Sequence, residues 1–366
     1  MKNAYLLIGI RFSVFYKLLS RNKISFKPKY LLRFLLIFNE SIWNTFFAWI
    51  EKKRYQKKLE NHPVPTNPVF VVGHWRTGST FLHQLLSLDD QYLTTSLFQV
   101  AKPDSFVSSR RYYKPIMSLF LGGSRPFDQV KTGFDEPQED EFAMFRLTSF
   151  SPLEGLIFPQ SQNYFLENYP DLLPSAENIP TWENELKLFY KKLTYFDPNK
   201  MVLIKNPFHS MRIPTLKRLF PDAKFIHIYR HPIDVVPSTI KMWTTVGSQN
   251  LLKGKLMPLN FSEVTNYLLK MENKIVNDFS NFLDNDHCEI KYEDLEKDPV
   301  AEIRIAYNKL GLELNSITIS KINGFLKEIG EFKKNKHHLN QEEADCISKA
   351  ISEGFFSERY LTKTRI

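Results

Sequence analysis

The chain has 366 residues, of which 43% are hydrophobic and 24% are charged, an ordinary globular composition that excludes a disordered or fibrous protein. Its length corresponds to about two domains or to one large α/β domain. The two cysteines, Cys288 and Cys346, are too few for a disulfide framework and lack the spacing of metal ligands. They fit a reducing, cytoplasmic environment.

The positive charge of the chain is concentrated at its N-terminus. The whole sequence has a net charge of +9, but residues 1–60 alone hold 13 basic and three acidic residues, a net +10. The other 306 residues carry 36 basic and 37 acidic residues. A nearly neutral body argues against nucleic acid as a partner. An anionic membrane surface becomes a candidate partner of the first 60 residues.

Residues 1–62 are expected to form a basic segment of amphipathic helices. Aromatic and aliphatic residues recur at spacings of three and four and are mixed with Lys and Arg, the pattern of an amphipathic helix. The longest run without charge, residues 41–50, is too short to span a bilayer, and Arg11 interrupts the apolar run that a secretory signal needs. Two interpretations stay open: the helices pack on the rest of the protein, or they lie in a lipid interface.

A Pro-rich stretch at residues 62–68 precedes the expected main domain, residues 68–366. It is followed by a short apolar run at 69–72, typical of a buried parallel strand, and then by a loop at 73–80 and a helical pattern at 81–86. In this order of strand, glycine-bounded loop and helix, backbone N–H groups point at an anion. The sequence therefore predicts a phosphate site in the loop.

The loop has the Gly-x-x-x-x-Gly spacing of a Walker A motif, but Ser79 stands where the lysine of nucleotide triphosphatases belongs. An ordinary ATPase or kinase is therefore disfavoured. Arg76 supplies a cation earlier in the loop, so we expect it to face the reactive end of the ligand. The residues expected to hold a phosphate are Thr77, Gly78, Ser79 and Thr80.

Two further apolar runs, 201–205 and 224–229, predict buried strands, and helices are expected at 210–220 and 235–243. Strands that alternate with helices in this way predict an α/β fold with a parallel sheet flanked by helices. Ligands of such sheets bind at the carboxyl ends of the strands. Gly73, Lys205 and Arg230 occupy those ends.

Several segments resemble the sulfotransferases that use 3′-phosphoadenosine-5′-phosphosulfate (PAPS). FVVGHWRTGSTFLHQLL resembles their 5′-phosphosulfate loop, and KFIHIYRHPIDVVPSTI resembles their 3′-phosphate-binding strand and helix. KNPFHSMRIPTLKRLFPDAKF is similar to their lysine-bearing segment, and CEIKYEDLEKDP to their element near the adenine. DEPQEDEFA is similar to a stretch of bacterial members. The resemblance extends over about residues 68–300 and implies a P-loop-type sheet.

The resemblance implies a PAPS-dependent sulfotransferase in which an acceptor hydroxyl attacks sulfur in line with base assistance and no metal is required. Arg76 and Lys205 would stabilise the leaving oxygen. Arg230 and Ser238 would hold the 3′-phosphate, and Tyr292 would contact adenine. Lys336 belongs to a basic loop expected to close over the nucleotide.

The general base has two candidates. Some relatives use a carboxylate near the phosphosulfate loop, but the corresponding residues here, 94–99, contain no acid. The acidic run around Glu139 offers the first candidate. His209, four residues after Lys205, is the second, because other relatives use a histidine close to the strand-end lysine.

The acceptor is expected to be a hydroxylated molecule, with a lipid or glycolipid favoured and a sugar as the alternative. The enzyme would be cytoplasmic or peripheral at the inner face of the membrane. A P-loop phosphotransferase is a competing class, but it needs Mg²⁺ ligands and a loop lysine. A catalytically silent membrane scaffold is a second competing class. Such a scaffold would have no need of all four residues Arg76, Lys205, Arg230 and Ser238.

Overall fold

A computed structural model describes residues 6–23, 28–110, 133, 135–159, 170–256, 258–330 and 339–353. The chain falls into two compact units, each assembled from separate stretches of sequence. The first unit comprises Met1–Thr66, Leu93–Ile204 and Trp243–Pro258, and the second comprises Asn67–Tyr92, Lys205–Met242 and Leu259–Ile366. The division into 1–62 and 68–366 expected from the sequence stays a prediction.

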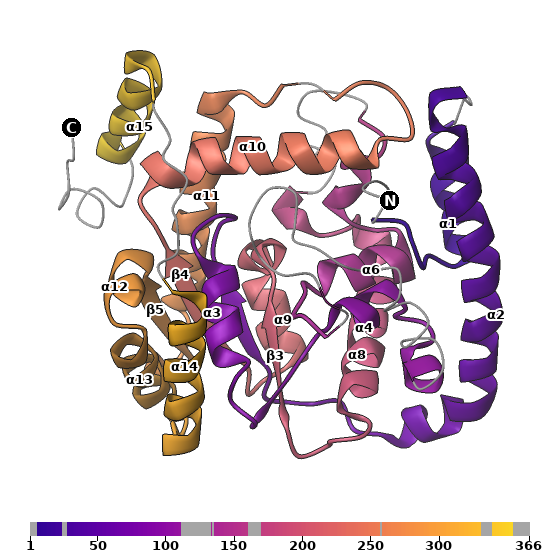
Figure 1. The fold of residues 1–366 in the computed structure, drawn as a ribbon, viewed down its shortest axis with the longest axis horizontal. Coiled ribbons are helices and arrows are strands. Elements are labelled where there is room, and N and C mark those ends of the chain that lie inside the picture. Colours follow the sequence, from indigo (N-terminus) through magenta and orange to yellow (C-terminus); the bar gives the residue numbers. More distant parts are fainter. Residues whose placement is uncertain are drawn as a thin grey trace. The chain divides into compact units, whose positions relative to one another are not determined.

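The structure confirms the α/β fold with a parallel sheet. The five strands are β1 (Val69–Val72), β2 (Tyr92–Thr94), β3 (Met201–Lys205), β4 (Lys224–Tyr229) and β5 (His287–Lys291), in the order β2-β3-β1-β4-β5. Strands β3, β4 and β5 are labelled in Figure 1. Strand β4 pairs parallel with β1 and with β5. Strand β1 is buried along its whole length, as its four apolar residues require. Parallel pairing sets the ends of β1 and β4 at the same sheet edge.

The second unit packs helices around β1, β4 and β5. These helices are α3 (Ser79–Leu86), α9 (Ile213–Leu219), the start of α10 (Pro232–Asn250), α11 (Phe261–Phe279), α12 (Tyr292–Lys297), α13 (Pro299–Leu310), α14 (Ser316–Ile329) and α15 (Gln341–Glu353). Phe70 and Phe225, on neighbouring strands, stack with ring centroids 5.4 Å apart in the core. Aromatic packing of this kind fixes the strands that carry the candidate site.

The expected helix at 210–220 is interrupted. A 3₁₀ helix, η5 (Pro207–Met211), comes first, and α9 begins only at Ile213. The Asn206 side chain accepts a hydrogen bond from the Phe208 N–H and so caps η5. Pro214 lies in the first turn of α9, where its missing N–H costs nothing, and it therefore marks a new helix start.

The first unit contains the predicted N-terminal helices. Its described helices are α1 (Phe12–Arg21), α2 (Leu31–Asn61), α4 (Leu97–Ala101), α6 (Glu141–Thr148) and α8 (Ile179–Thr194), together with the last turns of α10 and short 3₁₀ segments. Among the described residues, no helix is sufficiently long and apolar to span a bilayer.

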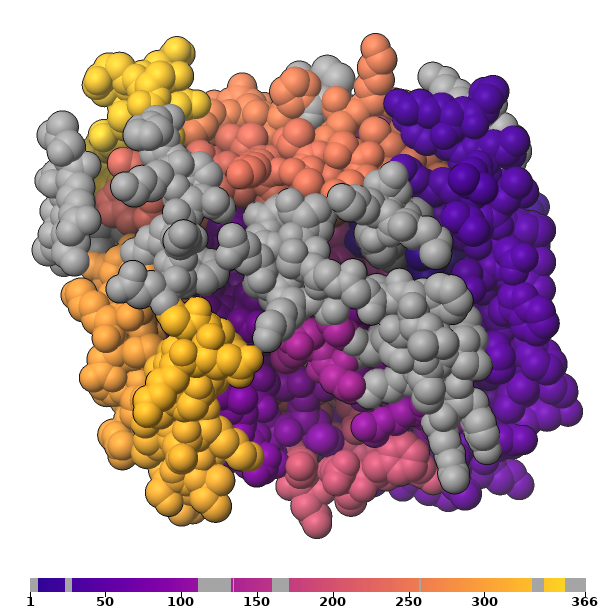
Figure 2. All heavy atoms as spheres, viewed as in Figure 1, coloured from indigo at the N-terminus to yellow at the C-terminus, as the bar shows by residue number. Residues whose placement is uncertain are grey.

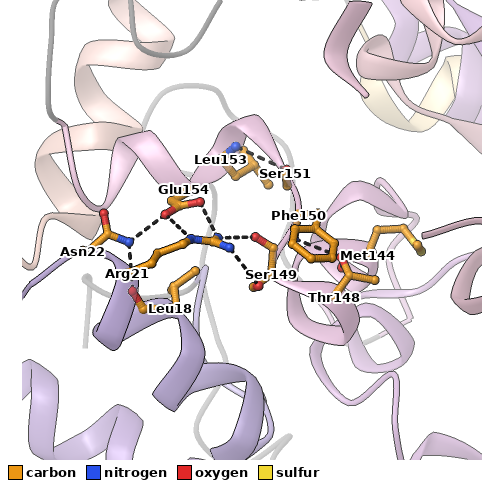
Figure 3. Close-up of polar contacts among 10 residues, drawn as sticks. All are labelled: Leu18, Arg21, Asn22, Met144, Thr148, Ser149, Phe150, Ser151, Leu153 and Glu154. Atoms are coloured by element: carbon orange, nitrogen blue, oxygen red, sulfur yellow. Dashed lines mark hydrogen bonds and ion pairs between the residues drawn. The ribbon is translucent and has the colours of Figure 1, made fainter. Parts of the chain in front are cut away.

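One face of α1 packs on the rest of the first unit. Val14, Phe15 and Leu18 are buried on this face. At the end of the helix, the Arg21 Nε donates to Glu154 Oε1 at 2.8 Å, and Asn22 donates to the same carboxylate (Figure 3). This face of α1 is therefore part of the core of the first unit.

Helix α2 is anchored by polar groups on its inner face. Glu51 is buried, forms an ion pair with Lys192 and accepts a hydrogen bond from the Ser108 N–H at 2.9 Å. Asn44 is also buried and donates to the Gly9 carbonyl. These contacts fix which side of α2 faces the first unit.

Candidate nucleotide-binding site

The loop between β1 and α3 depends on two glycines that no other residue can replace without displacement. A Cβ at Gly73 would lie 2.2 Å from the Ile228 carbonyl oxygen, and one at Gly78 would lie 2.1 Å from the Tyr292 ring. Both glycines have positive φ, 139° and 92°. The close approach sets the N-terminus of α3 immediately beyond β1, where helix N–H groups attract an anion.

The residues between the two glycines form a bonded turn. The Thr77 hydroxyl donates to the His74 carbonyl at 2.8 Å, and Thr77 is fully buried. Burial lowers the pKa of His74 to about 4, so its ring is neutral at pH 7. Arg76 has a φ of 70°, which is strained for a residue with a side chain. Arg76 is the single Lys or Arg of residues 73–80 and so supplies the permanent positive charge of the loop.

Lys205 ends β3, and the residues after it contact β1 through the backbone and the loop through the Ser210 side chain. The Asn206 N–H donates to the Val71 carbonyl at 3.3 Å. The Ser210 hydroxyl accepts from the Gly73 N–H at 2.8 Å and donates to the Gly73 carbonyl at 3.0 Å. Sequence reasoning missed Ser210, whose role depends on a partner 137 residues away.

Arg230, directly after β4, contacts two other side chains of the site. Its guanidinium lies 4.4 Å from the centroid of the Tyr292 ring, and its Nη2 pairs with Asp234 at 2.9 Å. The same Tyr292 ring faces Gly78 of the loop. Burial is the main cause that raises the Tyr292 pKa to about 12, so the phenol is neutral. Tyr292 thus links the end of β4 to the loop.

The first turns of α10 also contact the loop. The Ser238 hydroxyl accepts a hydrogen bond from Arg76 Nε at 2.9 Å. One residue later, Thr239 donates from its hydroxyl to the Trp75 carbonyl at 3.3 Å. The two segments predicted to hold the two ends of PAPS are therefore in direct contact.

Aromatic rings support the loop. The Trp75 ring packs edge-on against Phe208, with centroids 4.9 Å apart, and lies nearly parallel to Tyr267 of α11 at 6.5 Å. Trp75 itself is buried. Sequence reasoning did not identify Tyr267, because no local signal marks a contact between residues 192 positions apart.

The two predicted bases have different surroundings. His209 is fully buried, with its ring edge-on to Phe70 at 5.6 Å and its Nδ1 3.5 Å from the Arg212 guanidinium. Glu139 is half-buried, in the first unit. The backbone before it pairs with residues 95–97, because the Gln138 N–H donates to the Thr95 carbonyl at 2.8 Å and the Leu97 N–H to the Glu136 carbonyl at 3.0 Å.

The structure thus brings together, within the second unit, five of the predicted residues: Arg76, Gly78, Arg230, Ser238 and Tyr292. The same loop contains Thr77, and α3 begins with Ser79 and Thr80. Lys205 is next to Asn206, whose backbone N–H donates to the Val71 carbonyl of β1. Lys336 lies outside the described residues. Within the described ranges, no group of three or more His, Cys, Asp or Glu side chains converges as metal ligands would.

A strand that runs into a glycine-dependent loop and a helix N-terminus, with Arg and Lys at adjoining strand ends, is the arrangement of a P-loop-type α/β fold. The model of the sulfotransferase family matches residues 68–316, more than half of the chain. The chain therefore belongs to the sulfotransferase family, and it is a transferase enzyme.

Individual relatives agree with this assignment. The chain is 29% identical to the omega-hydroxy-beta-dihydromenaquinone-9 sulfotransferase Stf3 of Mycobacterium bovis, over 94% of this chain and 88% of that protein, and equally to Stf3 of Mycobacterium tuberculosis. The crystal structure of sulfotransferase STF9 from Mycobacterium avium has a TM-score of 0.69 at 15% identity and covers 94% of this chain and 96% of its own. Sulfotransferase STF1 from Mycobacterium tuberculosis has a TM-score of 0.61 at 14% identity, covering 92% and 91%.

Proposed function

We propose that this enzyme transfers the sulfuryl group of PAPS to a hydroxyl group of a lipid. The hydrogen bond from Arg76 to Ser238 carries the proposal, because it unites the loop for one end of the nucleotide with the helix for the other. A loop without the Walker lysine supports PAPS over a nucleoside triphosphate. Membership of the sulfotransferase family supports the reaction.

The three cations divide between two tasks in this proposal. PAPS supplies the sulfuryl group: a new bond forms between the acceptor oxygen and sulfur, while the bond from sulfur to the 5′-phosphate oxygen breaks. Arg76 and Lys205 stabilise the negative charge that grows on that phosphate oxygen. Arg230 and Ser238 bind the 3′-phosphate, where Arg230 exchanges its partner Asp234 for the phosphate. Tyr292 holds the Arg230 guanidinium in place and contacts adenine.

Glu139 is the base that takes the acceptor proton in this proposal. The family resemblance implies a carboxylate base in the stretch that corresponds to residues 94–99, which has no acid here. The backbone contacts of residues 136–138 with 95–97 bring Glu139 next to that stretch. His209 is the weaker candidate, because its buried ring already packs against Phe70.

A lipid alcohol is the proposed acceptor, with a sugar as the alternative. The supporting observation is the 29% identity, over nearly the full chain, to an enzyme named for an omega-hydroxylated menaquinone. The proposed acceptor class is a long-chain lipid with a free hydroxyl.

The test combines binding with turnover. The 3′,5′-bisphosphate product of PAPS should stabilise the protein against heat without added metal, and Mg-ATP should stabilise it much less. Incubation with labelled PAPS and a total lipid and glycan extract should then yield a labelled lipid, identified by mass. Equal stabilisation by Mg-ATP contradicts the donor, a labelled glycan contradicts the acceptor, and binding without any transfer supports the silent scaffold.

A further inference from the structure

The outer face of α2 is apolar along most of its length. Its large side chains, from Leu31 to Trp49, repeat at spacings of three and four residues and so share one side of the helix. Over these 18 steps the face is about 27 Å long. The exposed members are Leu31, Leu32, Leu35, Leu36, Phe38, Ile42, Trp43, Phe46 and Trp49. Figure 2 shows the side chains of α2, in indigo, at the molecular surface.

The apolar outer face departs from the usual polarity of a surface helix. The side of α2 that packs on the first unit carries Ser41, Asn44 and Glu51, all buried and hydrogen-bonded, beside the buried Ile37 and Leu59. The side that faces outward carries Trp43 and Trp49, each more than half exposed. A helix adapted to water alone places its apolar residues inward. The outer face is therefore adapted to an apolar environment outside the protein.

Exposed apolar residues are also concentrated in this part of the molecule. Of the 18 large apolar side chains that are exposed in the described residues, 11 lie on α1 and α2. Phe12 and Tyr16 of α1 extend the face, since the Phe12 ring contacts Phe38 at 5.8 Å and its N–H donates to Thr45 at 2.9 Å. An apolar patch of this extent on a soluble protein marks an interaction surface.

A basic cluster follows the apolar face on the same helix. Lys52, Lys53, Arg54, Lys57 and Lys58 are exposed, and no acidic residue interrupts them. The Lys53 ammonium lies 4.3 Å above the Trp49 ring. Amphipathic helices in lipid interfaces combine these features: aromatic and aliphatic side chains in the acyl boundary, and cations at the headgroups. A second copy of this chain would bring the same five positive charges to the contact, which opposes self-association through this end.

We propose that α2, extended by Phe12 and Tyr16, is a membrane-docking face that lies flat in the interface of an anionic lipid bilayer. The apolar residues from Leu31 to Trp49 enter the acyl boundary, and Lys52–Lys58 contact the anionic headgroups. This inference deepens the proposed function, because a lipid acceptor has to be collected from a bilayer. Its test, however, requires neither PAPS nor turnover.

The first experiment is flotation of the full-length protein with vesicles of phosphatidylcholine, with and without phosphatidylglycerol, at low and high salt. The wild type should float with the anionic vesicles, and high salt should reduce but not abolish its binding. The triple variant Trp43→Gln, Phe46→Gln, Trp49→Gln should bind about tenfold less or weaker still. The matched control, Ile305→Gln with Ile317→Gln, removes comparably exposed apolar side chains from α13 and α14 and should bind like the wild type.

A second experiment places the helix in the lipid. Trp43 and Trp49 are exposed, Trp243 is half-buried, and Trp75 and Trp182 are buried, so bromine-labelled acyl chains should quench chiefly the first pair. Trp43→Phe with Trp49→Phe should retain vesicle binding and lose most of the quenching. Retention of the quenching in this variant contradicts the proposed contact.

The proposal is overturned if the wild type does not bind anionic vesicles at low salt, or if the triple variant binds them like the wild type. It is also overturned if the wild type is a dimer that binds no vesicles and the triple variant is a monomer. That last result assigns the face to self-association. Affinity for the 3′,5′-bisphosphate, measured on the same proteins, reports folding of the nucleotide site. Vesicle binding without sulfate transfer would support the docking face and contradict the proposed function. Sulfate transfer without vesicle binding would support the proposed function and contradict the docking face.

Discussion

Arg76 Nε donates a hydrogen bond of 2.9 Å to the Ser238 hydroxyl, across 162 residues of sequence. Arg76 lies in the loop after β1 and is strained, with a φ of 70°, while Ser238 lies on α10. The contact gives the guanidinium a fixed direction. A residue predicted to bind the 3′-phosphate thereby also orients the cation predicted to face the leaving oxygen.

Ser238→Ala should weaken binding of the 3′,5′-bisphosphate by roughly tenfold, the cost of one charge-assisted hydrogen bond. It should also lower kcat, because Arg76 loses the group that orients it. Calorimetric titration and initial rates measure the two effects. Ser248→Ala removes an exposed hydroxyl from the same helix and should change neither. A Ser238 variant with normal affinity and normal kcat would show that the contact is incidental.

Lys205→Ala and Arg230→Ala should separate turnover from binding. The Lys205 cation is needed as charge develops on the leaving oxygen, so kcat should fall by about 100-fold or more while affinity for the bisphosphate changes little. Arg230→Ala should chiefly weaken binding. Lys200→Ala, just before β3, serves as the control. The reverse pattern would exchange the two roles.

Gly78→Ala should destabilise the protein by more than about 2 kcal/mol, because its Cβ would lie 2.1 Å from the Tyr292 ring at a φ of 92°. Gly311→Ala isolates the backbone cost: its φ is 69° and its Cβ would meet nothing within 4 Å, so about 1 kcal/mol is expected. Chemical denaturation measures both. Equal losses at the two positions would show that the contact with Tyr292 relaxes freely.

Glu139→Gln should lower kcat by about 100-fold and leave bisphosphate affinity intact, because a general base acts on the acceptor and not on the nucleotide. Glu136→Gln, in the same acidic run, should keep its activity. His209→Asn competes as the alternative. If it abolishes turnover in a protein of normal thermal stability, while Glu139→Gln remains active, His209 is the base.

Stability should decline at alkaline pH through His227. Burial alone would lower its pKa, but Glu272 and Glu289, each 3.0 Å from a ring nitrogen, raise it to about 9. Because the folded pKa exceeds the unfolded value near 6.5, the stabilisation is complete below about pH 6.5 and is lost as the pH rises through about 9. From the size of this shift, the free energy of unfolding should fall by about 3 kcal/mol over that range.

The comparison with Glu289→Gln isolates this effect from other groups that titrate at high pH. One carboxylate remains in that variant, so the pKa of His227 is lower and the loss of stability moves to lower pH. Glu313→Gln removes an exposed carboxylate and should follow the wild type. Superimposable pH curves for all three proteins would contradict the assignment.

The sequence alone determined the elements that depend on local pattern. The structure has strands at 69–72, 201–205 and 224–229, where continuous apolar runs predicted them. A strand that is buried on both faces is apolar at every position, so the sequence shows it without knowledge of its neighbours. The glycine loop and the strand-end positions of Lys205 and Arg230 were likewise predicted from the sequence, since parallel strands end at one edge of the sheet. The break between η5 and α9 was not predicted, although Pro214 signals a helix start there.

Tertiary structure alone decided which distant side chains meet. Nothing local pairs Arg76 with Ser238, sets Tyr292 between Gly78 and Arg230, or ties Ser210 to Gly73, because these contacts depend on how separate elements pack. The same holds for α2. Periodicity shows that a helix has an apolar face, but only packing decides which face is buried. Here Ser41, Asn44 and Glu51 lie on the buried side with Ile37 and Leu59, while Trp43, Phe46 and Trp49 are exposed.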